Sequence, residues 1–102
     1  MNNKIAALGN KEIVTVFKSV GAEVFSCNSS YKINATLKML FDEEYTLILI
    51  TENEYLQSLD FIKNLPNSAY PIILPIPNGV TYTGLAAKRI DDFKQKAIGA
   101  GT

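Results

Sequence analysis

Few residues in this chain have the type and spacing to do chemistry. None of the 102 residues is histidine, so the commonest general base and metal ligand is missing, and acid–base work would fall to carboxylates, lysines or tyrosines. Cys27 is the only cysteine, so no histidine can activate it and no second thiol can resolve it. We therefore expect Cys27 to be a small, partly buried side chain at the end of a strand, in a protein that fits a reducing cytosol.

Two dipeptides, Gly9-Asn10 and Thr51-Glu52, directly follow apolar runs and could border a ligand site. A dinucleotide or phosphate site would need several glycines there, so that backbone could approach a pyrophosphate, and Gly9 stands alone. A receiver domain would need acidic residues after its first strand and a phosphoacceptor aspartate after its third, where this chain has Asn10 and Thr51. We expect Glu52 and Glu54 to be ordinary first-turn helix residues, and we expect no catalytic residue and no cofactor.

The overall charge excludes partners that depend on a strong electrostatic field. Ten basic residues balance ten acidic ones, which argues against nucleic acid as a partner. The longest strongly apolar run beyond the first residues, 45–51, is far shorter than the roughly 20 residues that span a bilayer, so we expect no membrane insertion. The acidic run 42–44 lacks the alternating oxygen ligands of a calcium loop, so we expect it to be solvated and to hold no metal ion.

Four β-rich runs position these loops, and each run is followed by a segment with helical periodicity. The runs cover residues 4–8, 23–27, 46–51 and 70–76. Strands that alternate with helices at this spacing form consecutive βαβ units with right-handed crossovers. The sequence therefore predicts an α/β fold, a doubly wound four-stranded parallel sheet with a C-terminal helix.

The composition of the runs predicts the strand order. The run 47–50 is apolar on both sides, as expected of a central strand. Pro71 and Pro75 cannot donate to a ladder and place the fourth run at an edge, and Glu23 and Ser26 suit the other edge. We predict the order 2-1-3-4, with the topological switch between the first and third strands.

Local signals predict where the helices begin and end. Asn10 is a candidate N-cap for the first helix, and Gly21 ends that helix. Ser29 or Ser30 is a candidate N-cap for the second helix. Pro66 disfavours helical backbone in the residue before it, so the third helix must end near residue 65. The apolar stripes of these three helices are Ile13, Phe17 and Val20; then Ile33, Leu37, Leu40 and Phe41; then Tyr55, Leu59 and Ile62.

The C-terminal segment is predicted to be a helix that begins near residue 83 and ends at Gly99. Its apolar residues Ala86, Ile90, Phe93 and Ala97 are spaced four, three and four, which forms a narrow heptad-like seam. This seam could cover the chain's own sheet or a helix of another protein, and periodicity alone leaves both open. We treat residues 1–77 as a Rossmann-like or receiver-like core and residues 78–102 as a turn plus helix of the same single domain.

Several segments, taken together in order, resemble the F-type central-stalk component of V-type and A-type ATPases. The similarity covers Lys4 to Gly9, then Val14, Phe17 and Gly21, then Leu47 to Glu52, then Pro71 to Pro77, and finally Arg89 with Lys96 to Gly99. Each piece alone is a generic strand or turn, so the order, the spacing and the total length make the resemblance specific. Many members of the family have aspartate where this chain has Asn10.

The resemblance implies a non-catalytic subunit of the central stalk, paired with the long coiled-coil D subunit in the shaft that turns inside the ATP-hydrolysing head. It implies further contacts with the rotor socket and with head subunits, and a cytoplasmic location peripheral to the membrane. By this analogy the C-terminal seam becomes a partner contact, with Arg89 and Lys96 as flanking ionic contacts. Whether the parent machine moves protons or sodium ions, and in which direction it runs, stays open.

A second function remains in competition from the residues alone. An α/β domain that binds a small molecule or phosphate would use the switch-point crevice at Gly9, Asn10, Thr51 and Glu52. It would need a defined pocket with convergent polar groups, whereas the stalk subunit would need a protein-binding surface.

Overall fold

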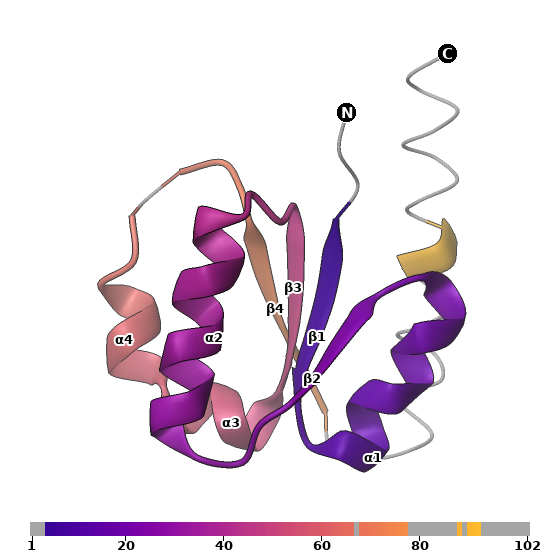
Figure 1. Ribbon diagram of the computed structural model, residues 1–102, viewed down its shortest axis with the longest axis horizontal. Helices are drawn as coiled ribbons and strands as arrows, with labels where there is room; N and C mark the ends of the chain where they lie inside the picture. The colour runs from indigo at the N-terminus through magenta and orange to yellow at the C-terminus, as the bar shows by residue number, and fades with distance from the viewer. Residues whose placement is uncertain (1–3, 67, 78–87, 89, 93–102) are drawn as a thin grey trace.

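The computed structural model describes residues 4–66, 68–77, 88 and 90–92. Its centre is a four-stranded parallel sheet in the order β2-β1-β3-β4, with helices on both faces (Figure 1). The strand order and the doubly wound α/β class predicted from the sequence are confirmed. The strands are β1 (Ile5–Gly9), β2 (Glu23–Ser26), β3 (Leu47–Thr51) and β4 (Ile72–Ile76).

The two central strands are the most apolar ones, as their sequences require. Every residue of β1 and β3 is buried, because helices cover both faces of these strands. The edge strands β2 and β4 have mixed burial. Pro75 lies in β4 opposite Ile50 of β3, at an edge where a missing N–H is tolerated.

The first crossover begins as predicted but changes its helix type partway. The Asn10 side chain accepts from the backbone N–H groups of Glu12 and Ile13, and α1 (Lys11–Val14) follows. From Thr15 the chain continues as a 3₁₀ helix, η1 (Thr15–Val20). The β-branched run 14–16 favours helix poorly, which fits the tighter turns. Gly21 ends the segment with a left-handed φ of 85°, as predicted.

The next two crossovers form one long helix and two short ones. Ser29 caps α2 (Ser30–Asp42), whose buried residues are Ile33, Leu37 and Leu40. The third crossover was predicted as one helix, but it is broken at Ser58 into α3 (Glu52–Gln57) and α4 (Leu59–Lys63). At the break the Ser58 N–H is shared between the carbonyls of Glu54 and Tyr55. The apolar periodicity does not detect this break, because Tyr55, Leu59 and Ile62 keep their spacing across it.

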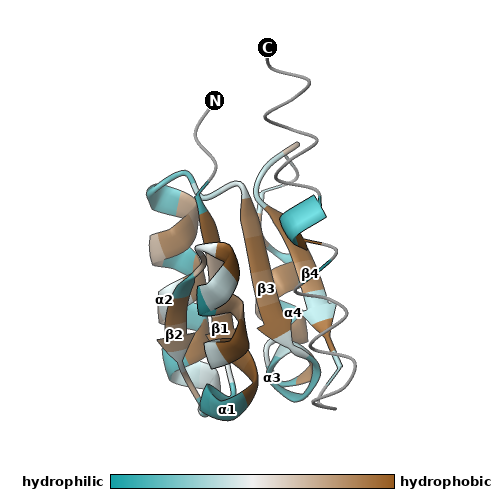
Figure 2. Cartoon of the chain, turned by 90° about the vertical axis from the view of Figure 1, so that its right-hand side faces the viewer, coloured by the Kyte–Doolittle hydropathy of each residue, from teal (hydrophilic) through white to brown (hydrophobic). Residues whose placement is uncertain are grey.

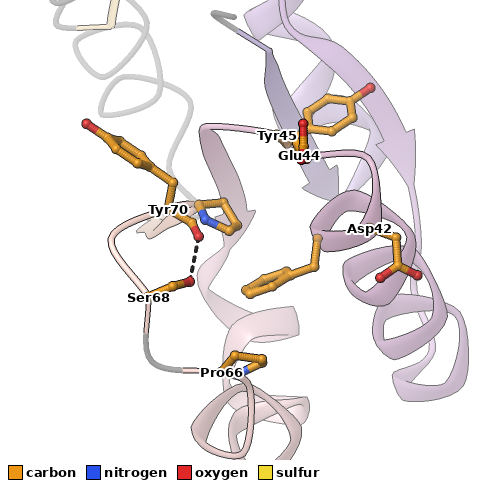
Figure 3. Close-up of a pocket in the computed structure, with 8 residues that line it drawn as sticks. Asp42, Glu44, Tyr45, Pro66, Ser68 and Tyr70 are labelled. Carbon is orange, nitrogen blue, oxygen red and sulfur yellow. Dashed lines mark hydrogen bonds between the residues drawn. The ribbon is translucent and has the colours of Figure 1, made fainter. Parts of the chain in front are cut away.

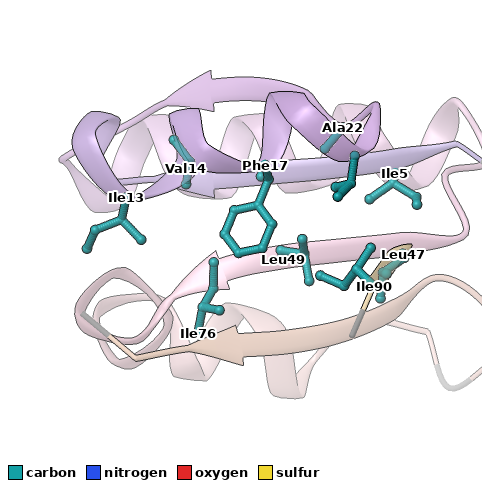
Figure 4. Close-up of a cluster of buried hydrophobic side chains, with 11 residues drawn as sticks. Ile5, Ile13, Val14, Phe17, Ala22, Leu47, Leu49, Ile76 and Ile90 are labelled. Atoms are coloured by element: carbon teal, nitrogen blue, oxygen red, sulfur yellow. The ribbon is translucent and has the colours of Figure 1, made fainter. Parts of the chain in front are cut away.

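Two apolar clusters, one on each face of the sheet, form the core. The α1-side cluster contains Ile5, Ala7, Ile13, Val14, Phe17, Val20, Ala22, Leu47, Leu49, Ile76 and Ile90 (Figure 4). The α2-side cluster contains Ala6, Leu8, Cys27, Ile33, Leu37, Leu40, Tyr45, Ile48 and Ile50. Figure 2 shows the apolar residues as brown bands along the strands and the inner sides of the helices. Among the described residues, no helix is long and apolar enough to cross a membrane.

The predicted C-terminal helix lies mostly outside the described residues. Lys88 and residues 90–92 have helical backbone, in agreement with the prediction for those positions.

Candidate functional site

The switch point between β1 and β3 is the first place to seek a ligand site, and a threonine side chain fills it. Thr51, at the end of β3, is fully buried beside Gly9, at the end of β1. A Cβ on Gly9 would lie 1.9 Å from Thr51 Oγ1, and Gly9 has a φ of +129°. Glycine is therefore required at position 9, both by its backbone conformation and by the close approach of Thr51.

The hydroxyl of Thr51 both accepts and donates a hydrogen bond within the chain. It accepts a hydrogen bond from the backbone N–H of Asn10 at 3.2 Å and donates one to Oε1 of Glu54. Glu54 is 8% exposed and lies in the first turn of α3. The sequence placed Glu54 in this turn but could not show that its carboxylate folds back onto Thr51. The spacing of these two residues, a hydroxyl residue followed three positions later by glutamate, was the available signal.

Two of the backbone donors at the start of α1, the N–H groups of Glu12 and Ile13, are also occupied. Asn10 Oδ1 accepts from the N–H of Glu12 at 3.0 Å and of Ile13 at 3.4 Å. A phosphate bound at a helix N-terminus would need these N–H groups, together with that of Asn10, which donates to Thr51. The four residues of the predicted crevice are thus brought together, but Asn10 and Thr51 close it, and Glu52 is an exposed first-turn residue. The geometry therefore argues against ligand binding at the switch point.

Cys27 lies just after β2 and is 7% exposed, so it is buried more completely than predicted. Its Sγ is 3.6 Å from Oγ1 of Thr36, and its backbone N–H donates to the carbonyl of Gly9 at 2.9 Å. The backbone of Cys27 therefore joins the end of β2 to β1, and its thiol is a small buried side chain in contact with α2. Within the described ranges, no three acidic or cysteine side chains come together to form a metal site.

A hollow of about 360 Å³ lies at the opposite, amino ends of β3 and β4 (Figure 3). Its lining residues come from the end of α2, from the connection between α2 and β3, and from the connection into β4: Phe41, Asp42, Glu44, Tyr45, Pro66, Ser68, Tyr70 and Pro71. Ser68 donates to the carbonyl of Tyr70 at 2.8 Å, and the side chains of Asp42 and Tyr70 point to opposite sides of the hollow. Because its polar groups do not converge, the hollow offers no evident way to orient a small molecule.

Tyr45 lines the hollow, and its surroundings shift the pKa of its phenol. Burial raises the pKa of its phenol, and the nearby carboxylates of Glu23 and Glu43 raise this pKa further. The Lys4 ammonium lies 5.2 Å from the centre of the Tyr45 ring and donates to the carbonyl of Glu43 at 3.2 Å. The phenol therefore stays protonated near neutral pH and does not act as a base.

Of the six residues predicted to bind a partner, only Ile90 belongs to the described part of the chain. It is 4% exposed and packs in the α1-side cluster, near Leu47 and Leu49 of β3 (Figure 4). Its side chain is therefore used by the chain's own core. Ala86, Arg89, Phe93, Lys96 and Ala97 lie outside the described residues.

On its described residues, the chain is a doubly wound α/β domain whose switch point is filled by the buried side chain of Thr51. Comparison with known proteins makes the class specific. The chain belongs to the family described as ATP synthase (F/14-kDa) subunit, whose pattern matches residues 5–93. The family resemblance seen in the sequence is confirmed.

Individual relatives cover nearly the whole chain. The F subunit of the V-type ATP synthase of Fusobacterium nucleatum is 29% identical over 97 residues, which cover 95% of this chain and 92% of the relative. The F subunit of the A-type ATP synthase of Methanosphaera stadtmanae is 32% identical over 102 residues, with 97% of this chain and 95% of the relative covered. The corresponding V-type protein of Clostridium perfringens is 27% identical over 99 residues, with 97% and 94% covered. As a member of this family, the chain is a subunit of a rotary V/A-type ATP synthase complex.

Proposed function

We propose that this chain is a non-catalytic subunit of the central stalk of a rotary V-type or A-type ATPase. It binds the long coiled-coil D subunit and helps couple ATP hydrolysis or synthesis in the head to proton or sodium transport across the membrane. The observation that carries the proposal is the family match over residues 5–93, together with the V-type and A-type relatives that align over nearly their full length. The chain works in the cytoplasm, peripheral to the membrane, and also contacts the rotor socket and head subunits.

The closed switch point supports a non-catalytic role. A working site in an open α/β sheet would use the crevice beyond the carboxyl ends of the strands, and here Thr51 and Asn10 occupy it. With that crevice filled, the chain's contribution to the complex is binding and mechanical coupling.

The C-terminal seam is the proposed contact with the coiled coil, flanked by Arg89 and Lys96. Residues three and four apart share a face of a helix. Because Ile90 is buried in the chain's own core, the rest of the seam could pack either on the chain's own sheet or on the coiled coil. In this proposal Ile90 anchors the helix to the chain's own core. Phe93 distinguishes the two arrangements, because it contacts either the coiled coil or the chain's own sheet. A large aromatic side chain is the usual centre of such a contact.

Replacing Phe93 by alanine tests the proposal. Full burial of one such side chain in an interface contributes about 1.5 to 3 kcal/mol, so we expect Phe93→Ala to weaken binding to the purified coiled-coil subunit by roughly 10- to 100-fold. The isolated variant should keep the circular dichroism spectrum and the urea midpoint of the original chain. Binding is measured by calorimetry or surface plasmon resonance.

Tyr31→Ala is the matched control, because Tyr31 is an aromatic residue on α2 that is 84% exposed. Its loss should change affinity less than twofold. If Phe93→Ala lowers the urea midpoint but leaves the affinity per folded molecule unchanged, Phe93 belongs to the core and the seam is not the contact. If the unchanged chain does not bind the coiled-coil subunit at all, the proposed function fails.

A further inference from the structure

The outer edge of β4 ends the sheet with apolar side chains beside it. Among the described residues, β3 is the only strand that pairs with β4, so the other side of β4 has no neighbouring strand there (Figure 2). Ile72 and Leu74 are 45% and 44% exposed, and residues 70–77 carry no charge. An apolar, uncharged edge strand is a template for pairing with another chain, and a second copy of the same protein offers such a strand.

Prolines remove hydrogen-bond donors from this edge. The Ile72 N–H donates to the carbonyl of Thr46 at 3.0 Å, so even-numbered residues of β4 direct their backbone N–H groups towards β3. Odd-numbered residues therefore direct theirs outward. Pro71 and Pro75 belong to this outward set and have no N–H. Between residues 71 and 75, Ile73 is left as the only outward backbone donor.

The opposite edge of the sheet differs in its chemistry. β2 keeps its backbone donors, because residues 23–27 include no proline. It is only four residues long, and Glu23 and Ser26 at its two ends are exposed. A short edge strand with a charged side chain pairs poorly with another chain even when its donors are present. The prolines thus lie on the edge whose side chains give no such protection.

We infer that Pro71 and Pro75 block strand addition at the outer edge of β4 and so prevent a second copy of the chain from pairing there. The same loss of donors opposes strand addition by an extended segment of any other protein. The inference goes beyond the proposed function and does not depend on it, because it concerns the chain alone.

The pairing that the prolines prevent can be specified. In an antiparallel pair of β4 strands centred on Leu74, Ile73 of each copy would lie opposite Pro75 of the other copy. Opposed residues at such a position exchange two N–H···O bonds, and Pro75 can donate neither of its own. The two Leu74 side chains would lie side by side and bury each other. Apolar burial therefore favours this dimer, and the missing donors oppose it.

Restoring one donor tests the inference. Pro75 is exposed, and Pro75→Val adds an outward N–H with a residue that suits a strand. We expect this variant to self-associate at concentrations at least roughly ten-fold lower than the original chain, as measured by sedimentation velocity. Pro66→Val is the matched control, because Pro66 is also exposed but lies between α4 and β4. It should associate no more than the original chain.

Disulfide trapping shows where the copies meet. Opposed residues at a non-hydrogen-bonded position of an antiparallel pair have Cα atoms about 4.5 Å apart, which suits a disulfide. In a Cys27→Ser background, which has no other thiol, Leu74→Cys should form a covalent dimer with oxidised glutathione as the oxidant. Adding Pro75→Val should speed this reaction at least roughly ten-fold. Leu56→Cys, at a 59% exposed position on α3, should react equally fast with and without Pro75→Val.

Three results would overturn the inference. One is that Pro75→Val is folded by circular dichroism, stays as monomeric as the original chain, and does not speed trapping at position 74. Another is that the original chain already pairs through position 74. The third is that Pro66→Val associates as strongly as Pro75→Val. If Pro75→Val does not fold, Pro75→Ala restores the same donor with a smaller side chain and is judged by the same three results.

Discussion

At the scale of single residues, the contact between Gly9 and Thr51 closes the switch point between β1 and β3. Thr51 Oγ1 occupies the space that a side chain on residue 9 would need, and it bonds to Asn10 and Glu54. The hydroxyl therefore serves as a structural link between the ends of β1 and β3 rather than as a ligand contact. The crevice that binds nucleotides in other wound sheets is here filled by the buried side chain of Thr51.

Gly9→Ala should destabilise the protein strongly. The added Cβ would lie 1.9 Å from Thr51 Oγ1 at a φ of +129°. Backbone strain and overpacking together should lower the free energy of unfolding by roughly 2 to 5 kcal/mol, measured by urea denaturation. Because the clash is with Thr51, the double variant Gly9→Ala/Thr51→Ala should lose clearly less than the sum of the two single changes. Additive losses would show that Thr51 is not the obstacle.

At the scale of elements, caps and proline positions set the beginnings of helices and the edges of the sheet. Asn10 starts α1 and Ser29 starts α2, each with a side-chain oxygen on free backbone N–H groups. Pro71 and Pro75 keep β4 at the edge and remove donors from its outer side. Element boundaries thus follow from local chemistry, and this is why most of them could be predicted.

Asn10→Ala should lower the free energy of unfolding by about 1 kcal/mol, because the N–H groups of Glu12 and Ile13 would lose their acceptor. Asn10→Asp is the matched control, since aspartate keeps the acceptor and its charge is favourable at a helix N-terminus. It should be as stable as the original chain when both are compared by thermal and urea unfolding. Equal loss in both variants would mean that the amide group itself, and not the accepting oxygen, stabilises the helix.

At the scale of the whole molecule, Ile90 brings a side chain from the C-terminal region into the core of the domain. Ile90 packs in the α1-side cluster with residues from β1, β3, β4 and α1. Residues 1–77 therefore lack one of the side chains that seal this face. We expect residues 78–102 to be part of the same cooperative unit, as proposed from the sequence.

The Ile90→Ala variant tests whether residues 78–102 unfold together with the rest of the domain. Removing a large side chain from a packed core should lower the free energy of unfolding by about 2 to 5 kcal/mol, in a single urea transition. Leu56→Ala, at a position that is 59% exposed, should change it by less than about 0.5 kcal/mol. A loss at Ile90 no larger than that at Leu56 would mean that the C-terminal turn does not contribute to the folded core.

The strand order and most element boundaries could be read from the sequence, because each has a local cause. The continuous apolar run 47–50 identified β3 as central, and prolines and polar residues identified β4 and β2 as the edges, which left β1 beside β3. Asn10, Gly21 and Ser29 marked helix ends. The 3₁₀ segment from Thr15 and the break at Ser58 were missed, because the apolar spacing continues through both. Periodicity reports which residues share a face but not how tightly the backbone is wound.

The sequence by itself determined the class of sheet, the order of its strands and the family, since these depend on local pattern and on the order of segments. The tertiary structure alone decided three other matters: Thr51 fills the switch point, Ile90 is used by the core, and Ile72 and Leu74 stay exposed beside buried partners on β3. Each depends on the volume and position of side chains that are distant in the chain. A pattern along the sequence predicts an apolar face, but only packing in three dimensions determines what that face contacts.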